Sequence, residues 1–169
     1  MSRVSSSSPP PEPRVNYGEA ARRHHRDAET LFAAGRHANA DHLYGIAAEC
    51  ALLGILRGSP AARKLFDAEG TVKEPMRRHV NVLWNQLSKE AEGLRLGKAM
   101  GRLQQHFSVN PFTGWSVRQR YLSDQGVLIE VTEETLLKHR KAAELCVRLL
   151  DDMRPPRTER SEHVERSSR

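Results

Sequence analysis

One carboxylate of this sequence stands in an apolar stretch where a charge is costly. Between Asp41 and Arg57 the only charged residue is Glu49, in the middle of NADHLYGIAAECALLGIL, residues 39–56. A carboxylate among apolar side chains must be neutralised, paired, or placed at the edge of a cleft. The sequence leaves two interpretations of this residue open.

In the structural interpretation, Glu49 pairs with Arg118 or Arg120 and ties a later loop to the helices. In the functional interpretation, four residues surround a cleft that accepts the phosphate of a nucleotide or an RNA. These four candidate ligand-binding residues are Glu49, His79, Arg120 and Tyr121. Taken alone, His79 fits a histidine at a helix end better than a catalyst, and no catalytic residue is assigned.

Other patterns with chemical meaning are weak. The pairs His24-His25 and His37 with His42 lack further ligands at zinc spacing, so we expect neither a metal nor another cofactor. Glycine-rich phosphate loops and a nucleophile elbow are absent from the sequence. The basic block 22–26 fits a solvent-facing helix surface or, alternatively, a rim that contacts nucleic-acid phosphates. Five successive residues point all around a helix, so they cannot form one flat patch.

The elements that must position these residues are helices. Within 39–56, apolar residues recur every three or four positions and cover nearly the whole circumference, which predicts a buried central helix. At 1.5 Å per residue this helix is about 27 Å long, which spans a membrane only marginally, and Asp41 and Glu49 argue against a membrane. The sequence therefore predicts an all-α, antiparallel bundle of about five helices.

The other helices are placed by caps and helix-breaking residues. They are predicted over 17–35 (ending at Gly35), 61–68 (after Ser59-Pro60), 76–107, and 133–153 (after the N-cap Thr132). Three glycines, Gly93, Gly97 and Gly101, interrupt the third of these and predict two helices with a break near 93–97. A ridge of small residues that allows close helix or dimer contact is the alternative.

Residues 108–131 form a long connection before the last helix. Structureless connections of this length are uncommon in compact domains and are often functional. We expect Trp115, Val117 and Tyr121 to anchor this connection to the helices.

Composition separates the ends of the 169-residue chain from its middle. Residues 1–16 are rich in serine and proline, and residues 154–169 are polar, so both are predicted to be disordered tails of a domain over 17–153. The net charge of +6 is shared equally between the tails and this domain. The domain is therefore only mildly basic, less so than is usual for a strong nucleic-acid-binding protein.

Two features bear on the compartment. The first residues lack the apolar segment of a signal peptide. Cys50 and Cys146 lie on apolar helical faces, where free cysteines behave as small hydrophobic residues. We therefore expect a reduced, cytoplasmic protein.

The order of these features resembles the HEPN domain family (higher eukaryotes and prokaryotes nucleotide-binding). The resemblance is carried by Asp27-Ala28 and Leu31, by residues 40–53 with Ala47-Ala48-Glu49, by His79 and Leu83, by the Trp115…Arg120-Tyr121 loop, and by the alanines of the last helix. It implies a compact antiparallel bundle that commonly forms a homodimer. Many relatives accompany small nucleotidyltransferase partner proteins or belong to toxin–antitoxin and defence systems.

Active relatives are metal-independent ribonucleases, in which four to six residues separate an arginine from a following histidine. The histidine serves as acid or base on the ribose 2′-hydroxyl and the leaving oxygen, and the arginine stabilises the phosphate charge. Matches to this spacing are no more frequent than chance predicts and lie away from the family's position: Arg36 with His42, and Arg157 with His163. His139 and Arg140 are adjacent, so they point about 100° apart on a helix.

The resemblance therefore favours a non-catalytic binding or interaction module. Its ligand would be a nucleotide, an RNA or a partner protein, and its context a toxin–antitoxin, nucleotidyltransferase-associated or defence system. A metal-independent endoribonuclease with a displaced Arg/His site is the alternative.

Overall fold

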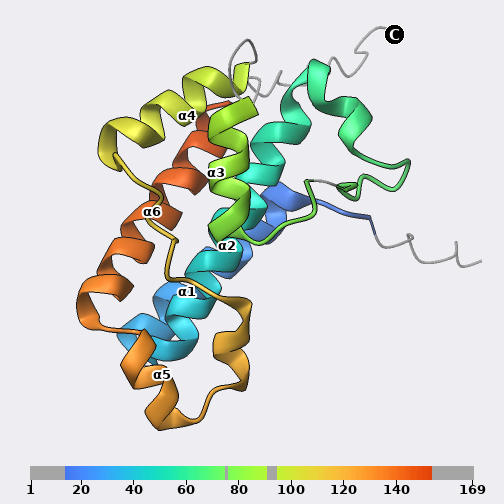
Figure 1. The fold of residues 1–169 in the computed structure, drawn as a ribbon. Helices are drawn as coiled ribbons and strands as arrows, with labels where there is room; N and C mark the ends of the chain where they lie inside the picture. The colour runs from blue at the N-terminus through green and yellow to red at the C-terminus, as the bar shows by residue number, and fades with distance from the viewer. Residues whose placement is uncertain (1–13, 75, 91–94, 154–169) are drawn as a thin grey trace, which may run out of the picture.

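The computed structural model describes residues 14–74, 76–90 and 95–153. These residues form an all-α bundle (Figure 1). Its elements are α1 (Tyr17–Ala33), α2 (His37–Gly58), η1 (Pro60–Leu65), α3 (Val80–Glu90), α4 (Arg95–His106), η2 (Val117–Tyr121), α5 (Asp124–Glu130) and α6 (Glu133–Asp152), where η1 and η2 are 3₁₀ helices. The predicted all-α bundle is confirmed.

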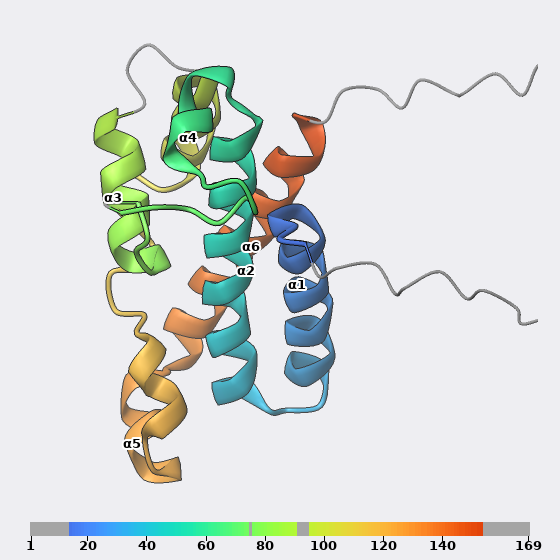
Figure 2. The same cartoon turned by 90° about the vertical axis from the view of Figure 1, so that its right-hand side faces the viewer.

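Helix α2 is the centre of the bundle. It contacts α1, α3 and α6 as well as both 3₁₀ helices, and Figure 2 shows α1 running antiparallel beside it. Tyr44, Leu52, Ile55 and Leu56 are among its buried side chains. Burial on several faces of one helix explains its nearly uninterrupted apolar sequence, and the predicted central helix is confirmed. Among the described residues, no helix has the length and apolar character needed to cross a membrane.

Two of the predicted capping residues, Gly35 and Thr132, lie at helix ends in the structure, and Asn16 is a cap that was not predicted. The Asn16 side chain accepts a hydrogen bond from the Glu19 amide, and Thr132 accepts one from the Thr135 amide. Gly35 has a φ of 71°, a conformation that glycine adopts without a steric penalty and that ends α1. Because Asn16 caps α1, the ordered structure begins earlier than the predicted tail 1–16 allows. Residues 1–13 of that tail, and all of 154–169, lie outside the described residues.

Two predicted helices differ in their bounds. The segment predicted as a helix over 61–68 is the 3₁₀ helix η1, in which the Ser59 side chain makes no capping hydrogen bond. The helix predicted from residue 76 begins only at Val80, and its continuation α4 begins at Arg95. Two separate helices are therefore confirmed, but Gly97 lies inside α4 rather than at the break, and residues 91–94 are outside the described part.

The connection 108–131 is more ordered than predicted. It contains η2 and the short helix α5, whose N-cap Ser123 accepts a hydrogen bond from the Gly126 amide at 3.2 Å. Trp115 is buried and Val117 packs partly against the core, as predicted. Tyr121 is 74% exposed and does not anchor the segment. The buried residue of η2 is instead Gln119.

Candidate functional site

The side of α2 that faces the 108–131 segment is built around a glycine. A Cβ atom placed on Gly45 would lie only 2.0 Å from Cε2 of Trp115, so the indole packs directly against the helix backbone. The Trp115 Nε1–H also donates to the Asp41 carbonyl oxygen at 3.2 Å. Because residues three and four apart share a helix face, α2 presents His42 before this indole and Glu49 after it.

Two histidines contact the buried indole. The His42 ring stacks on Trp115 with a centroid distance of 5.5 Å and an interplanar angle of 18°. The His79 ring meets Trp115 edge-on at 6.2 Å. His42 is half-buried, and its Nδ1 is fully enclosed without a hydrogen-bond partner among the described residues.

Glu49 is paired, but not with an arginine. Its Oε2 lies 3.2 Å from His79 Nδ1 and accepts a hydrogen bond from the Val80 amide at 3.1 Å. Val80 is the first residue of α3, so the carboxylate caps that helix where the helix dipole favours negative charge. Burial raises the pKa of Glu49, and the His79 ring and the Val80 amide oppose this shift. The prediction that Arg118 or Arg120 pairs with Glu49 is therefore wrong.

Arg120 approaches the same site from η2. Its Cζ lies 4.8 Å from the centroid of the Tyr121 ring, so the two candidate residues of the loop contact each other. The pKa of His42 is lowered, first by burial, then by the charge of Arg120, while Asp41 opposes the shift and His79 adds to it. His42 and His79 thus contact Trp115, and Arg120 acts on His42 through its charge. With Glu49 these residues are called the Trp115 cluster below.

The structure therefore places the four predicted residues in two contacting pairs and adds His42. Glu49 is in contact with His79, Arg120 is in contact with the exposed Tyr121, and the charge of Arg120 acts on His42. A pocket beside η2 is lined by Gly114, Ser116, Arg118, Leu122 and Glu130, and none of the four predicted residues lines it. His42 could have been found from the sequence, because its spacing of seven residues from Glu49 places both on one helix face.

A second, fully buried polar group lies beneath the cluster. Asp41 and His139 are 0% exposed, and their Oδ1 and Nδ1 atoms are 2.7 Å apart. Gln119 Nε2 lies 3.3 Å from the other carboxylate oxygen, and the Phe112 ring stacks on His139. Sequence reasoning missed this pair as a site, although His139 shares its helical face with buried Leu136 and Cys146.

The adjacent His139 and Arg140 point to different partners. His139 turns inward to Asp41, whereas Arg140 binds Glu29 through two hydrogen bonds of 2.8 and 2.6 Å. Tyr44 donates a hydrogen bond to the same Glu29 carboxylate. The Arg157–His163 pair lies outside the described residues, and Arg36 is exposed at the start of α2.

The remaining chemical candidates are isolated groups. In the part of the chain that the structure describes, no three His, Cys, Asp or Glu side chains are arranged to hold a metal ion. Cys50 and Cys146 are free, and burial raises the pKa of the Cys50 thiol to about 11. Of the basic block 22–26, Arg22 binds Asp151 while Arg23 and Arg26 are exposed.

Comparison with family models, with curated proteins and with solved structures gave no match to this chain. Function is therefore inferred from the residues of the site.

Proposed function

We propose that this chain is a HEPN-like helical module that binds the phosphate of an RNA or a nucleotide at the Trp115 cluster. The observation that carries the proposal is the contact of two imidazoles, His42 and His79, with one buried indole, with the charge of Arg120 acting on His42. A guanidinium forms paired hydrogen bonds with phosphate oxygens, and imidazoles add donors. The Glu49 carboxylate is engaged by His79 and Val80, which limits its repulsion of an anion.

The exposed Tyr121 ring favours RNA among these ligands. Single-stranded RNA is recognised by stacking of unpaired bases on aromatic rings next to positive charge. Tyr121 is 74% exposed and lies against Arg120, so a base could stack where its phosphate meets the guanidinium.

Binding of a labelled single-stranded RNA, followed by fluorescence anisotropy, tests the proposal. We expect Arg120→Gln to weaken binding and to reduce the slope of log K against log salt by about one. Tyr121→Ala should weaken binding without changing that slope, because it removes stacking but no charge. Arg63→Gln, which removes an exposed charge on η1, is the matched control. Equal losses in Arg120→Gln and Arg63→Gln would overturn the proposal, because they would indicate non-specific attraction.

A second candidate function, a metal-independent endoribonuclease, is favoured by the two imidazoles beside one arginine. The lowered pKa of His42 keeps that ring neutral near pH 7, ready to take the proton of a ribose 2′-hydroxyl. The 2′-oxygen would attack phosphorus, a 2′,3′-cyclic phosphate would form, and His79 would give a proton to the departing 5′-oxygen. Arg120 would stabilise the charge that develops on the phosphate.

Incubation with mixed RNA in the presence of EDTA separates the two functions. Cleavage that resists EDTA and is lost in both His42→Ala and His79→Ala would establish the ribonuclease. His106→Ala, an exposed histidine of α4, is the control. Binding without cleavage supports the non-catalytic module.

We also propose that the module acts in the cytoplasm as a homodimer with a nucleotidyltransferase-type partner, in a toxin–antitoxin or defence context. Support comes from the exposed apolar side chains of α5, where Leu128 and Ile129 are 74% and 79% exposed. Exposed apolar residues that lie together mark interaction surfaces. Light scattering after gel filtration should show a dimer that Leu128→Asp disrupts; a monomer at all concentrations would contradict the dimer.

A further inference from the structure

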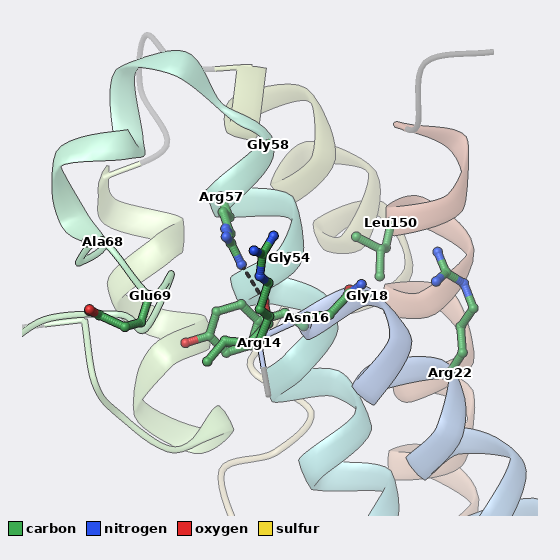
Figure 3. Close-up of a pocket in the computed structure, with 12 residues that line it drawn as sticks. Arg14, Asn16, Gly18, Arg22, Gly54, Arg57, Gly58, Ala68, Glu69 and Leu150 are labelled. Carbon is green, nitrogen blue, oxygen red and sulfur yellow. Dashed lines mark hydrogen bonds between the residues drawn. The ribbon is translucent and has the colours of Figure 1, made fainter. Parts of the chain in front are cut away.

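An open pocket lies where the start of α1 crosses the end of α2, away from the Trp115 cluster. Its volume is about 810 Å³. Figure 3 shows three arginines around it, from the segment before α1, from α1 and from α2. The lining residues that matter for its chemistry are Arg14, Gly18, Arg22, Gly54, Arg57 and Glu69.

Arg57 is fixed in the pocket by two contacts. Its Nη1 donates to the Val15 carbonyl oxygen at 2.8 Å. Its guanidinium also packs against Gly70, where an added Cβ would lie 2.3 Å from Nη2. Gly70 has a φ of 86°, which side-chain-bearing residues rarely adopt, so the turn is specialised for this close approach.

Arg14 and Arg57 form an unneutralised pair of like charges. Figure 3 shows their guanidinium groups pointing toward one another. Within the described residues neither makes an ion pair with a carboxylate. Two cations in one pocket repel each other, and an anion between them removes that cost.

The backbone adds donors to the same pocket. As the second residue of α1, Gly18 carries an amide N–H without an acceptor inside the helix. A Cβ on Gly54 would lie 3.7 Å from this nitrogen, and both glycines line the pocket. The positive end of the α1 dipole reinforces the arginines.

Two groups set the net charge of the pocket. Arg22 is neutralised by Asp151, to which it donates through Nε and Nη2. Glu69 lines the rim, and Figure 3 shows its carboxylate turned away from Arg14 and Arg57. The positive charges of Arg14 and Arg57, which make no ion pair among the described residues, therefore exceed the one negative charge of Glu69 at the rim.

We propose that this pocket binds a small phosphorylated ligand through Arg14, Arg57 and the Gly18 amide. Arginine forks match phosphate oxygens in pairs, and the volume accommodates a phosphate group together with a nucleoside-sized body. The proposal does not depend on the Trp115 cluster, which is built from other residues.

Isothermal titration of the full chain with pyrophosphate, ATP and uncharged adenosine tests the proposal. We expect pyrophosphate and ATP to bind and adenosine not to bind. Arg14→Gln and Arg57→Gln should each weaken pyrophosphate binding about tenfold, the loss of one charged hydrogen-bonding partner. Arg57→Lys, which keeps the charge but not the fork, should lose less. Arg26→Gln removes an equal charge elsewhere on α1 and should change nothing.

Two outcomes would overturn the proposal. One is the absence of pyrophosphate binding at millimolar concentration, and the other is an equal loss in Arg26→Gln and Arg14→Gln. The same titration with Arg120→Gln separates the two sites, because that variant should lose RNA binding and retain pyrophosphate binding. Arg14→Gln should do the reverse, and circular dichroism melts of both variants identify any loss that comes from unfolding.

Discussion

Helix α2 carries two carboxylate–imidazole pairs whose surroundings differ. Asp41 and His139 are fully buried and 2.7 Å apart, whereas the side chains of Glu49 and His79 are 22% and 54% exposed and 3.2 Å apart. A buried pair whose partner is removed leaves an uncompensated polar group, while water can replace a partner at an exposed pair. The first pair therefore stabilises the fold, whereas the second is accessible to a ligand.

Their further contacts support this division. Asp41 also meets Gln119, and its carbonyl accepts from Trp115, so the buried pair fixes the segment that carries Arg120. Glu49 caps α3 and holds a histidine at the surface. The buried pair thus supports the loop side of the Trp115 cluster, and the exposed pair forms its other edge.

Removal of the Asp41 side chain should have the largest effect on stability. Asp41→Ala leaves His139 and Gln119 buried without their acceptor and should lower the free energy of unfolding by about 3–5 kcal/mol. Urea titration followed by circular dichroism measures the loss. Glu49→Ala is the matched variant and should lose far less; equal losses in the two variants would contradict the division.

The next effect concerns the glycine beneath the indole. Gly45→Ala places a methyl group about where Trp115 now lies, so the indole must move, at a cost of about 1–3 kcal/mol. Both stability and tryptophan fluorescence should change. Gly101→Ala is the control, because nothing lies within 4 Å of its Cβ position and alanine favours a helix by about 1 kcal/mol. If Gly45→Ala were as stable as Gly101→Ala, the described packing would be incorrect.

Neutralisation of Glu49 should have a smaller effect. Glu49→Gln keeps an oxygen that can accept from the Val80 amide but removes the negative charge from the α3 N-terminus. We expect a loss of about 0.5–1 kcal/mol in the free energy of unfolding. RNA anisotropy with the same variant should show binding that is unchanged or slightly tighter. A clear loss of RNA binding would mean that the carboxylate itself contacts the ligand.

The smallest expected effect is the contribution of His42 protonation to stability. Because burial and Arg120 lower the pKa of His42 below its ordinary 6.5, the unfolded chain takes up this proton first as the pH falls. The contribution of His42 to stability is therefore complete above pH 6.5 and is lost as the pH falls through the folded-state pKa. An NMR titration of the ring proton should give a midpoint below 6.5 that rises in Arg120→Gln. An unchanged midpoint would place Arg120 away from the cluster.

The local sequence predicted the positions of the elements well where caps and periodicity were strong. One helix start was missed at Asn16. This residue follows a proline-rich segment and was therefore predicted to belong to the tail, although its side chain can cap a helix. The order within 108–131 was underestimated because η2 and α5 are too short for a periodic signal. Ser123 was the available signal for α5, as a potential N-cap.

The site was predicted only in part. Glu49 was correctly identified as a carboxylate that needs a partner, and His79 was named beside it, but the partner was expected to be an arginine. Asp41 and His139 each lie on a helix face whose other residues are apolar, but neither was predicted to face inward. That they meet could not be read from periodicity, which locates a face but not the residue opposite it.

Residue type and spacing alone determined that this chain forms helices, where α1, α2 and α6 begin and end to within about two residues, and that residues 39–56 lie at the centre. These properties depend on interactions between residues three or four positions apart. Only the tertiary structure decided which imidazole meets which carboxylate, that an indole lies on Gly45, and that two arginines share a pocket at the ends of α1 and α2. Such contacts join residues far apart in the chain, and they depend on how helices pack, which no local pattern encodes.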